Sequence, residues 1–302
     1  MSYRGEHNFL LENTEYTEHK GVDFSKYSAE ALEELWRKTV DTGMHGLCFS
    51  MYEDGQNPGD IITEAQVERR IEIIKPHTKW VRSFSCIEGN EYVPRMAHKH
   101  GLKTMVGAWL SDDLEKNEEE VEALIALAKE GYVDIAAVGN EVLYRDELTE
   151  AQLLDYIHIV KEALPGIPVG YVDAYYEFSH HPKITEVCDV ILSNCYPYWE
   201  GCDLENSLNH MQQMFGQASH AAQGKKVIIT ETGWPSHGTN LKGAYPSREN
   251  AMKYFINAQA WSAKENIEMF YFSSFDESWK VGPEGDVGAY WGLWDKDEKL
   301  KF

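Results

Sequence analysis

Residues 133–141 read Val133-Asp134-Ile135-Ala136-Ala137-Val138-Gly139-Asn140-Glu141, an apolar run of strand length that gives way to a polar turn. Helical patterns lie on both sides of this run. On the N-terminal side, Asn117 is expected to cap a helix over residues 118–130. On the C-terminal side, the capping box Thr149-Glu150-Ala151-Gln152 predicts a helix that ends at Pro165-Gly166. A strand between two helices predicts parallel strand pairing, because each crossover must return to the same edge of the sheet.

The same alternation recurs along the chain. Apolar runs of strand length are separated by about 20 to 40 residues, and the segments between them have a helical period. Eight βα units in 302 residues predict a single (β/α)8 TIM barrel, an α/β fold. The eight strands are expected over Gly46–Ser50, Trp80–Ser85, Leu102–Trp109, Val133–Val138, Pro168–Val172, Val187–Asn194, Lys226–Thr230 and Ile267–Ser273.

One domain is expected over residues 1–302, with residues 1–43 as an N-terminal lead-in segment and helix. No linker rich in proline, glycine or serine divides the chain. The alternative is an open, doubly wound sheet, which usually carries a glycine-rich phosphate turn after its first strand. Residues 51–59 follow the first expected strand and lack the G-x-G-x-x-G pattern, so the barrel is favoured.

The formal net charge of -22 narrows the range of partners. Nucleic acid and anionic membranes would be repelled by such a charge, so neither is expected to bind. A neutral ligand and a soluble monomer are the expectation. The five cysteines match no zinc-ribbon spacing, and we expect buried free thiols.

The sequence leaves the compartment open. Residues 1–18 are polar and lack the apolar core of a signal peptide, and no run approaches 18 consecutive apolar residues. We therefore expect neither a signal peptide nor a transmembrane segment in this chain. The protein would be periplasmic or secreted if a native signal has been removed, and cytoplasmic otherwise.

A second phrase places a glutamate in the same way as the first. In Ile229-Thr230-Glu231-Thr232-Gly233-Trp234-Pro235, the carboxylate again comes where an apolar run gives way to a polar turn. Active sites of such barrels lie at the C-terminal ends of the strands, so Glu141 and Glu231 are expected to belong to one site. Two carboxyl groups are the minimum equipment for splitting a glycosidic bond. One must hold a proton near neutral pH while the other stays ionised.

The ordered set of motifs resembles glycoside hydrolase family 17, which contains β-1,3-glucanases and β-1,3-glucanosyltransferases within a clan of (β/α)8 retaining glycosidases. Gly139-Asn140-Glu141 and the phrase from Ile229 to Ser236 resemble the family's two active-site motifs. Residues 52–59 look like the first loop of the short bacterial members. The resemblance runs from about residue 46 to residue 294, and its other similar segments are 81–86, 196–200, 275–280 and 291–294.

This resemblance implies a role for each matching residue. Glu141 resembles the general acid/base, Glu231 the nucleophile, and Asn140 the companion that contacts the sugar 2-hydroxyl. Tyr196 and Arg82 would donate hydrogen bonds to Glu231 and keep it ionised. Aromatic rings at strand ends suit the C–H faces of sugars, so three of them are expected as stacking platforms. The remaining substrate-binding candidates are Tyr52, Glu277 and Lys280 together with these platforms, Trp199, Trp234 and Phe275.

The sequence therefore predicts a retaining glycoside hydrolase that acts on laminarin-type β-1,3-glucan by double displacement, with endo-type hydrolysis and no cofactor. The alternative is a β-1,3-glucanosyltransferase, elongating or branching, because both reactions share the first half-reaction. A non-catalytic glucan-binding barrel is a remote alternative, since both glutamates are present. No metal site is expected, because no third ligand lies at usable spacing from His180-His181. Ser273 stands where family members often have glutamate.

Overall fold

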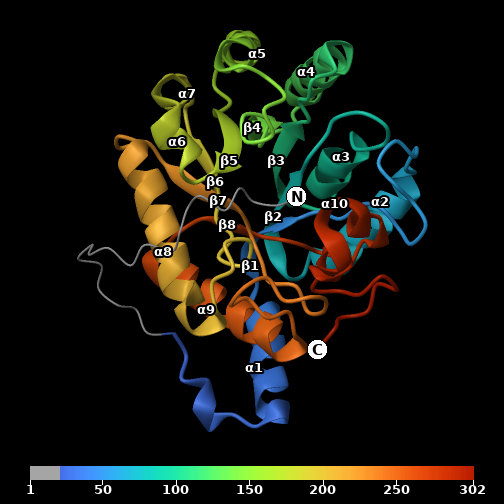
Figure 1. Ribbon diagram of the computed structural model, residues 1–302. Coiled ribbons are helices and arrows are strands. Elements are labelled where there is room, and N and C mark those ends of the chain that lie inside the picture. Colours follow the sequence, from blue (N-terminus) through green and yellow to red (C-terminus); the bar gives the residue numbers. More distant parts are fainter. Residues whose placement is uncertain (1–20) are drawn as a thin grey trace.

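The computed structural model describes residues 21–302 and contains a closed barrel of eight parallel strands paired in chain order from β1 to β8 (Figure 1). β8 pairs with β1 and closes the barrel. The predicted TIM barrel is therefore confirmed. The strands are β1 (Met44–Cys48), β2 (Thr78–Ser83), β3 (Lys103–Ala108), β4 (Ile135–Asn140), β5 (Val169–Ala174), β6 (Ile191–Asn194), β7 (Val227–Thr232) and β8 (Met269–Tyr271).

Helices surround the barrel, as Figure 1 shows. They are α1 (Ala29–Thr42), α2 (Glu64–Ile74), α3 (Tyr92–Lys99), α4 (Leu114–Lys129), α5 (Glu150–Ala163), α6 (Glu177–His180), α7 (Pro182–Val187), α8 (Leu204–Ala221), α9 (Arg248–Glu265) and α10 (Val281–Glu284). Short 3-10 helices occupy Phe24–Lys26, Ser278–Lys280 and Gly285–Tyr290. Helix α1 lies in the expected lead-in segment, whose residues 1–20 fall outside the described part. Among residues 21–302, no helix combines the length and apolarity needed to span a membrane.

Successive residues of β4 face opposite sides of the sheet, as strand geometry requires. Ala136 and Val138 belong to an apolar cluster that also contains residues of α4 and α5. Ile135 and Ala137 belong to the other cluster. The barrel therefore has an apolar interior and an apolar layer between strands and helices, and both layers hold the strand ends in place.

The start of α4 differs from the sequence prediction. The cap is Asp113, whose carboxylate accepts a hydrogen bond from the Lys116 amide, so the helix begins four residues earlier than expected. Asn117 lies inside the first turns and instead bonds the backbone N–H and C=O of Ser111, at 2.8 Å each. A capping residue can be misplaced by one turn because Asp and Asn are both favourable caps. Here the asparagine is used to hold the loop after β3.

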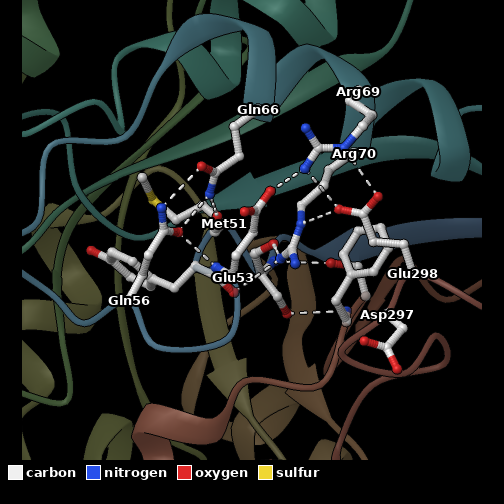
Figure 2. A network of polar contacts seen from close by, with 12 residues as sticks. Met51, Glu53, Gln56, Gln66, Arg69, Arg70, Asp297 and Glu298 are labelled. Carbon is white, nitrogen blue, oxygen red and sulfur yellow. Dashed lines mark hydrogen bonds and ion pairs between the residues drawn. The ribbon is translucent and has the colours of Figure 1, made fainter.

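A polar network fixes the loop after β1 against α2 and the C-terminal segment (Figure 2). Gln66 Nε2 donates to the Met51 carbonyl at 2.8 Å. The fully buried Arg70 donates to the Tyr52 carbonyl at 3.1 Å and to Glu298 at 2.9 Å. Two side chains of α2 therefore hold the backbone of Met51 and of Tyr52, which is a predicted binding residue.

Candidate active site

Glu141 and Glu231 meet at the C-terminal ends of β4 and β7. One nitrogen atom joins them: Asn194 Nδ2 donates to Glu141 Oε1 at 2.8 Å and to Glu231 Oε1 at 3.2 Å. The two carboxylate oxygens therefore lie no more than about 6 Å apart. All three side chains are buried, so the two carboxyl groups interact through a medium of low polarity.

Irregular strand pairing turns these residues toward each other. Ala137 pairs with Gly170 and Asn140 with Val172, so β4 carries one residue more than β5 over this stretch. The pairing of β7 with β6 and β8 is shifted in the same way around Glu231. Such bulges bend a strand and re-aim its side chains, and they are frequent beside active sites.

The backbone around Glu141 follows the bulge. Gly139 has a φ of 85° and Glu141 a φ of 52°, both in the left-handed region. Glycine adopts that region without cost, whereas a glutamate there is held by its surroundings. The Glu141 amide donates to the Val172 carbonyl at 2.8 Å. Glu141 thus sits on a turn whose shape is set by the neighbouring strand.

Three donors surround the Glu231 carboxylate. Arg82 Nη1 lies 2.7 Å from Oε1, Tyr196 Oη lies 2.8 Å from Oε2, and Asn194 adds the 3.2 Å contact. Both hydrogen bonds expected from Arg82 and Tyr196 are present. Donors of this kind favour the ionised form of a carboxyl group.

Arg82 connects both glutamate-bearing strands. Besides Glu231, its guanidinium donates from Nη2 to Asn140 Oδ1 at 2.7 Å, and it lies 4.2 Å from the centre of the Phe84 ring. Burial disfavours its charge, but the Glu231 carboxylate and the neighbouring Cys48 together more than offset this, and the pKa of Arg82 is raised. The buried cation therefore fixes Glu231 and Asn140 relative to each other.

The other glutamate has a different electrostatic environment. Burial, followed by the negative charge of Glu231, raises the pKa of Glu141 to about 7. The Asn194 hydrogen bond and the guanidinium groups of Arg145 and Arg82 act in the opposite direction. A carboxyl group with such a pKa can hold a proton near neutral pH and release it on demand.

A second cation lies beside the site in the segment after β8. Lys280 Nζ is 2.7 Å from Glu277 and 4.2 Å from the centre of the Phe272 ring. Burial lowers the pKa of Lys280, but the charges of Glu277, Glu284 and Glu231 raise it by more, so the ammonium stays charged. Glu277 also accepts a hydrogen bond from the Tyr52 amide at 3.3 Å. The predicted residues Tyr52, Glu277 and Lys280 therefore form one connected group.

The three predicted stacking platforms differ in exposure. Trp199 is half-buried, with its ring 5.4 Å from that of Trp291, and it can offer a face to a ligand. The prediction is wrong for Trp234 and Phe275, which are 1% and 0% exposed. Trp234 points into the protein and donates to the Tyr245 carbonyl at 3.0 Å.

Phe275 is covered by a cation and a ring. The Arg70 guanidinium lies 4.6 Å from its ring centre, and the Trp294 ring lies at 5.8 Å. A position at a strand end does not decide which way a ring points, because successive residues face opposite sides. Both wrongly predicted rings therefore stabilise the loops around the site instead of lining it.

Sequence reasoning did not assign a role to Asn194 or to Trp291. Asn194 ends an apolar run, and this position was its only signal. Trp291 lies in one of the segments that carry the family resemblance, and its ring packs against Tyr196 at 5.7 Å and against Trp199 at 5.4 Å. Within residues 21–302, no group of three or more His, Cys, Asp or Glu side chains is arranged to hold a metal ion.

The sequence is similar to a family of glycoside hydrolases and to fungal enzymes of that kind. The family described as the BtgE/BtgC glycoside hydrolase domain matches residues 46–292. A glucan 1,3-beta-glucosidase of Saccharomyces cerevisiae is 27% identical over 275 residues, which cover 82% of this chain and 87% of the relative. A glucan 1,3-beta-glucosidase of Arthroderma benhamiae is 30% identical over 266 residues, covering 81% and 85%.

Solved structures give a similar result. A glycoside hydrolase family 17 beta-1,3-glucanosyltransferase from Rhizomucor miehei superposes with a TM-score of 0.77 at 29% identity, covering 86% of this chain and 96% of that one. An active-site mutant of that enzyme, with the same scores, was solved in complex with laminaritriose. A Bacteroides uniformis beta-glucuronidase, at 16% identity and a TM-score of 0.65, shares the fold alone.

Proposed function

Because the chain belongs to the BtgE/BtgC family of glycoside hydrolases, we propose that it cleaves β-1,3-glucan with retention of configuration, using the two bridged glutamates. The predicted membership of glycoside hydrolase family 17 is confirmed by the match over residues 46–292 and by the similarity to a family 17 enzyme. The substrate is the one that the names of several relatives carry. The relatives reported above are fungal, and a bacterial subtype stays a prediction.

The proposed mechanism is a double displacement. Glu141 protonates the glycosidic oxygen while Glu231 attacks the anomeric carbon, which gives a covalent glycosyl-enzyme. Glu141 then acts as a base and activates the acceptor. The bridge through Asn194 is the observation that carries this proposal. It limits the separation of the two oxygens to about 6 Å, which favours the spacing of about 5–5.5 Å that retaining enzymes have over the 6.5–9.5 Å of inverting ones.

The two carboxyl groups have the environments that these roles need. Burial and the neighbouring negative charge keep a proton on Glu141 near neutral pH. Arg82, Tyr196 and Asn194 donate to Glu231, which favours the anion that attacks. A glycosidase of this kind needs no cofactor.

Substrate contacts are assigned from the same geometry. Asn140, held by Arg82, would meet the 2-hydroxyl of the sugar that is attacked. Trp199 would stack on a neighbouring sugar ring, and the group formed by Tyr52, Glu277 and Lys280 would bind hydroxyls on the β8 side of the site. Trp234 and Phe275 are left out of this assignment because they are buried.

Water is the proposed acceptor, with attack inside the glucan chain. The names of the relatives include both glucosidases and a glucanosyltransferase, so transfer to a second glucan is the second candidate. Both reactions use the same two glutamates and differ only in what the glycosyl-enzyme meets next. The acidic single-domain protein is proposed to act as a monomer, without nucleic acid or membrane.

A time course on laminari-oligosaccharides of one defined length, read by mass spectrometry, tests this function. Hydrolysis gives only shorter products. Products longer than the starting chain would indicate a glucanosyltransferase, and no change at all would contradict activity on β-1,3-glucan. Glu231→Gln, which keeps the size of the side chain, is the matched inactive control.

A further inference from the structure

A buried tyrosine–aspartate pair lies on β5, beside the turn that carries Glu141, and the mechanism above does not use it. Tyr171 is 1% and Asp173 0% exposed. Tyr171 belongs to the apolar cluster between the barrel and helices α4 and α5. Asp173 is two residues further along the strand and so shares that face. A carboxyl group buried in this apolar layer destabilises the protein unless both of its oxygens form hydrogen bonds.

Three backbone N–H groups of the Glu141 turn donate hydrogen bonds to three consecutive residues of β5. The Glu141 amide donates to the Val172 carbonyl at 2.8 Å. The Leu143 amide donates to the Tyr171 hydroxyl at 2.9 Å, and the Tyr144 amide donates to Asp173 Oδ2 at 3.4 Å. β4 and β5 are neighbours in the barrel (Figure 1), and these bonds extend their pairing past the end of β4.

The two side chains also hold each other. The Tyr171 hydroxyl donates to Asp173 Oδ2, and the other oxygen of Asp173 accepts the Ala174 amide at 2.7 Å. Each oxygen of this buried carboxyl group is therefore used. Ionising this carboxyl group is nevertheless unfavourable, because burial and then the charge of Glu141 raise the pKa of Asp173 well above its ordinary value.

The turn needs this support because its shape is unfavourable alone. Glu141 has a φ of 52°, which a side chain with a Cβ adopts only where its surroundings impose it. A Cβ on Gly139 would lie 3.4 Å from the Tyr171 ring, so the ring also packs under the start of the turn. Loss of either polar group would leave a buried N–H of the turn without its acceptor.

We propose that Tyr171 and Asp173 are positioning residues that hold the turn of residues 141–145 and thereby aim the Glu141 carboxyl group at the glycosidic oxygen. This inference rests on the proposed function, because it assumes that Glu141 is the general acid. Glu231 on β7, Arg145 on the same turn and Arg82 on β2 act on the charge of Glu141. Arg145 also holds the start of the turn, because its guanidinium donates to the Asn140 carbonyl and its amide donates to the Glu141 carbonyl at 2.9 Å.

The chemistry of the first step supplies a specific readout. The C1–O bond breaks, Glu231 forms the new bond to C1, and the proton of Glu141 passes to the departing oxygen. A sugar leaving group needs that proton, whereas a dinitrophenolate leaves without it. A misaimed acid therefore slows cleavage of a natural glucan and spares an activated aryl glycoside.

The test compares Asp173→Asn and Tyr171→Phe with the unchanged enzyme, using kcat/KM, which reports the first step alone for a retaining enzyme. The two substrates are a laminari-oligosaccharide and a dinitrophenyl β-laminaribioside. We expect a loss of about 10- to 100-fold on the oligosaccharide, as for a misplaced catalytic group, and less than about 3-fold on the aryl glycoside.

Tyr254→Phe on α9 is the matched control. It removes another buried hydroxyl, which contacts Thr232 and Met211 and not the Glu141 turn, so any loss should be equal on both substrates. Equal losses in Asp173→Asn and Tyr171→Phe, or no loss, would overturn the proposal and leave a structural role only. If Asp173→Asn does not fold, Tyr171→Phe, which lacks a single oxygen atom, decides.

Glu141→Ala separates failure of this inference from failure of the proposed function. If Glu141→Ala shows no difference between the two substrates, the assignment of the general acid is wrong. If Glu141→Ala shows the difference and the two β5 variants do not, the assignment stands and the positioning role alone is rejected.

Discussion

Arg82 Nη1 lies 2.7 Å from Glu231 Oε1, and this ion pair is almost completely buried. The same guanidinium donates a hydrogen bond to Asn140, so the positions of both Glu231 and Asn140 depend on this one side chain. Removing one partner of a buried pair leaves an uncompensated charge, which costs about 3–5 kcal/mol. The planar guanidinium group bonds Glu231 through one terminal nitrogen and Asn140 through the other, and a single ammonium group cannot replace both contacts in this geometry.

We therefore expect Arg82→Lys to lower kcat/KM on laminari-oligosaccharides by about 100-fold or more, although the charge is kept. Arg82→Met should in addition lower the free energy of unfolding by about 3–5 kcal/mol. Kinetics and thermal unfolding of both variants check this. A lysine variant with near-normal activity would show that the Asn140 contact is dispensable.

The pKa of about 7 at Glu141 predicts how activity depends on pH. The general acid must be protonated, so kcat/KM should fall as pH rises through about 7. On an aryl glycoside that needs no acid, this basic limb should be absent from the unchanged enzyme and from Glu141→Ala alike. A basic limb that persists in that variant would assign the titration to another group.

The same raised pKa predicts a stability effect. A carboxyl group whose pKa is raised on folding stabilises the native state below its unfolded pKa, and that contribution is lost as pH rises through about 7. Glu141→Gln should therefore be more stable than the unchanged protein above pH 7, by up to about 3 kcal/mol, and lose this advantage near pH 4. Unfolding at both pH values checks the sign, and an advantage confined to low pH would contradict it.

Anion rescue distinguishes the two glutamates. In Glu231→Ala, azide or formate can occupy the place of the nucleophile and restore turnover, with azide giving an α-configured product. In Glu141→Ala with an activated substrate, azide attacks the glycosyl-enzyme instead and gives a β-configured product. Nuclear magnetic resonance of the glycosyl azides reads the configuration, and swapped results would mean that the roles are reversed.

Trp199 and Trp234 make a matched pair, one half-buried and one buried. Trp199→Ala should raise KM for oligosaccharides by about 5-fold with a small effect on stability, because a stacking contact of about 1 kcal/mol is lost. Trp234→Ala should lower stability by about 3–5 kcal/mol through the cavity it leaves. A raised KM in Trp234→Ala together with a loss of stability in Trp199→Ala would contradict this and indicate that Trp234 stacks on the sugar.

The sequence was sufficient to predict the barrel, all eight strands and the two facing glutamates. The apolar periodicity and the helix-capping residues can be read from short stretches of sequence. The two glutamates could be placed together because the C-terminal ends of all parallel strands lie at the same end of the barrel. Boundaries shifted by a few residues, as in β1, which begins at Met44 and not at Gly46. The cap of α4 was misplaced because two favourable capping residues lie one turn apart.

What the sequence could not give depends on contacts between distant segments. The bridge through Asn194 joins residues 53 and 37 positions away. The buried Trp234 ring donates its hydrogen bond to a carbonyl in a later loop. Bulges in β4 and β7 depend on pairing with neighbouring strands and leave no local pattern. These contacts decide how the side chains of the site are oriented, whereas the local signals indicate only which strand ends carry them.

The most direct test of the central claim is to trap the covalent intermediate. A 2-deoxy-2-fluoro laminaribioside with a good leaving group should form a glycosyl-enzyme that turns over slowly, because the fluorine disfavours the oxocarbenium-like transition state. Mass spectrometry of the intact protein and of its peptides should find one sugar adduct, located on Glu231. No adduct, an adduct on another residue, or a first product of inverted configuration would contradict the account.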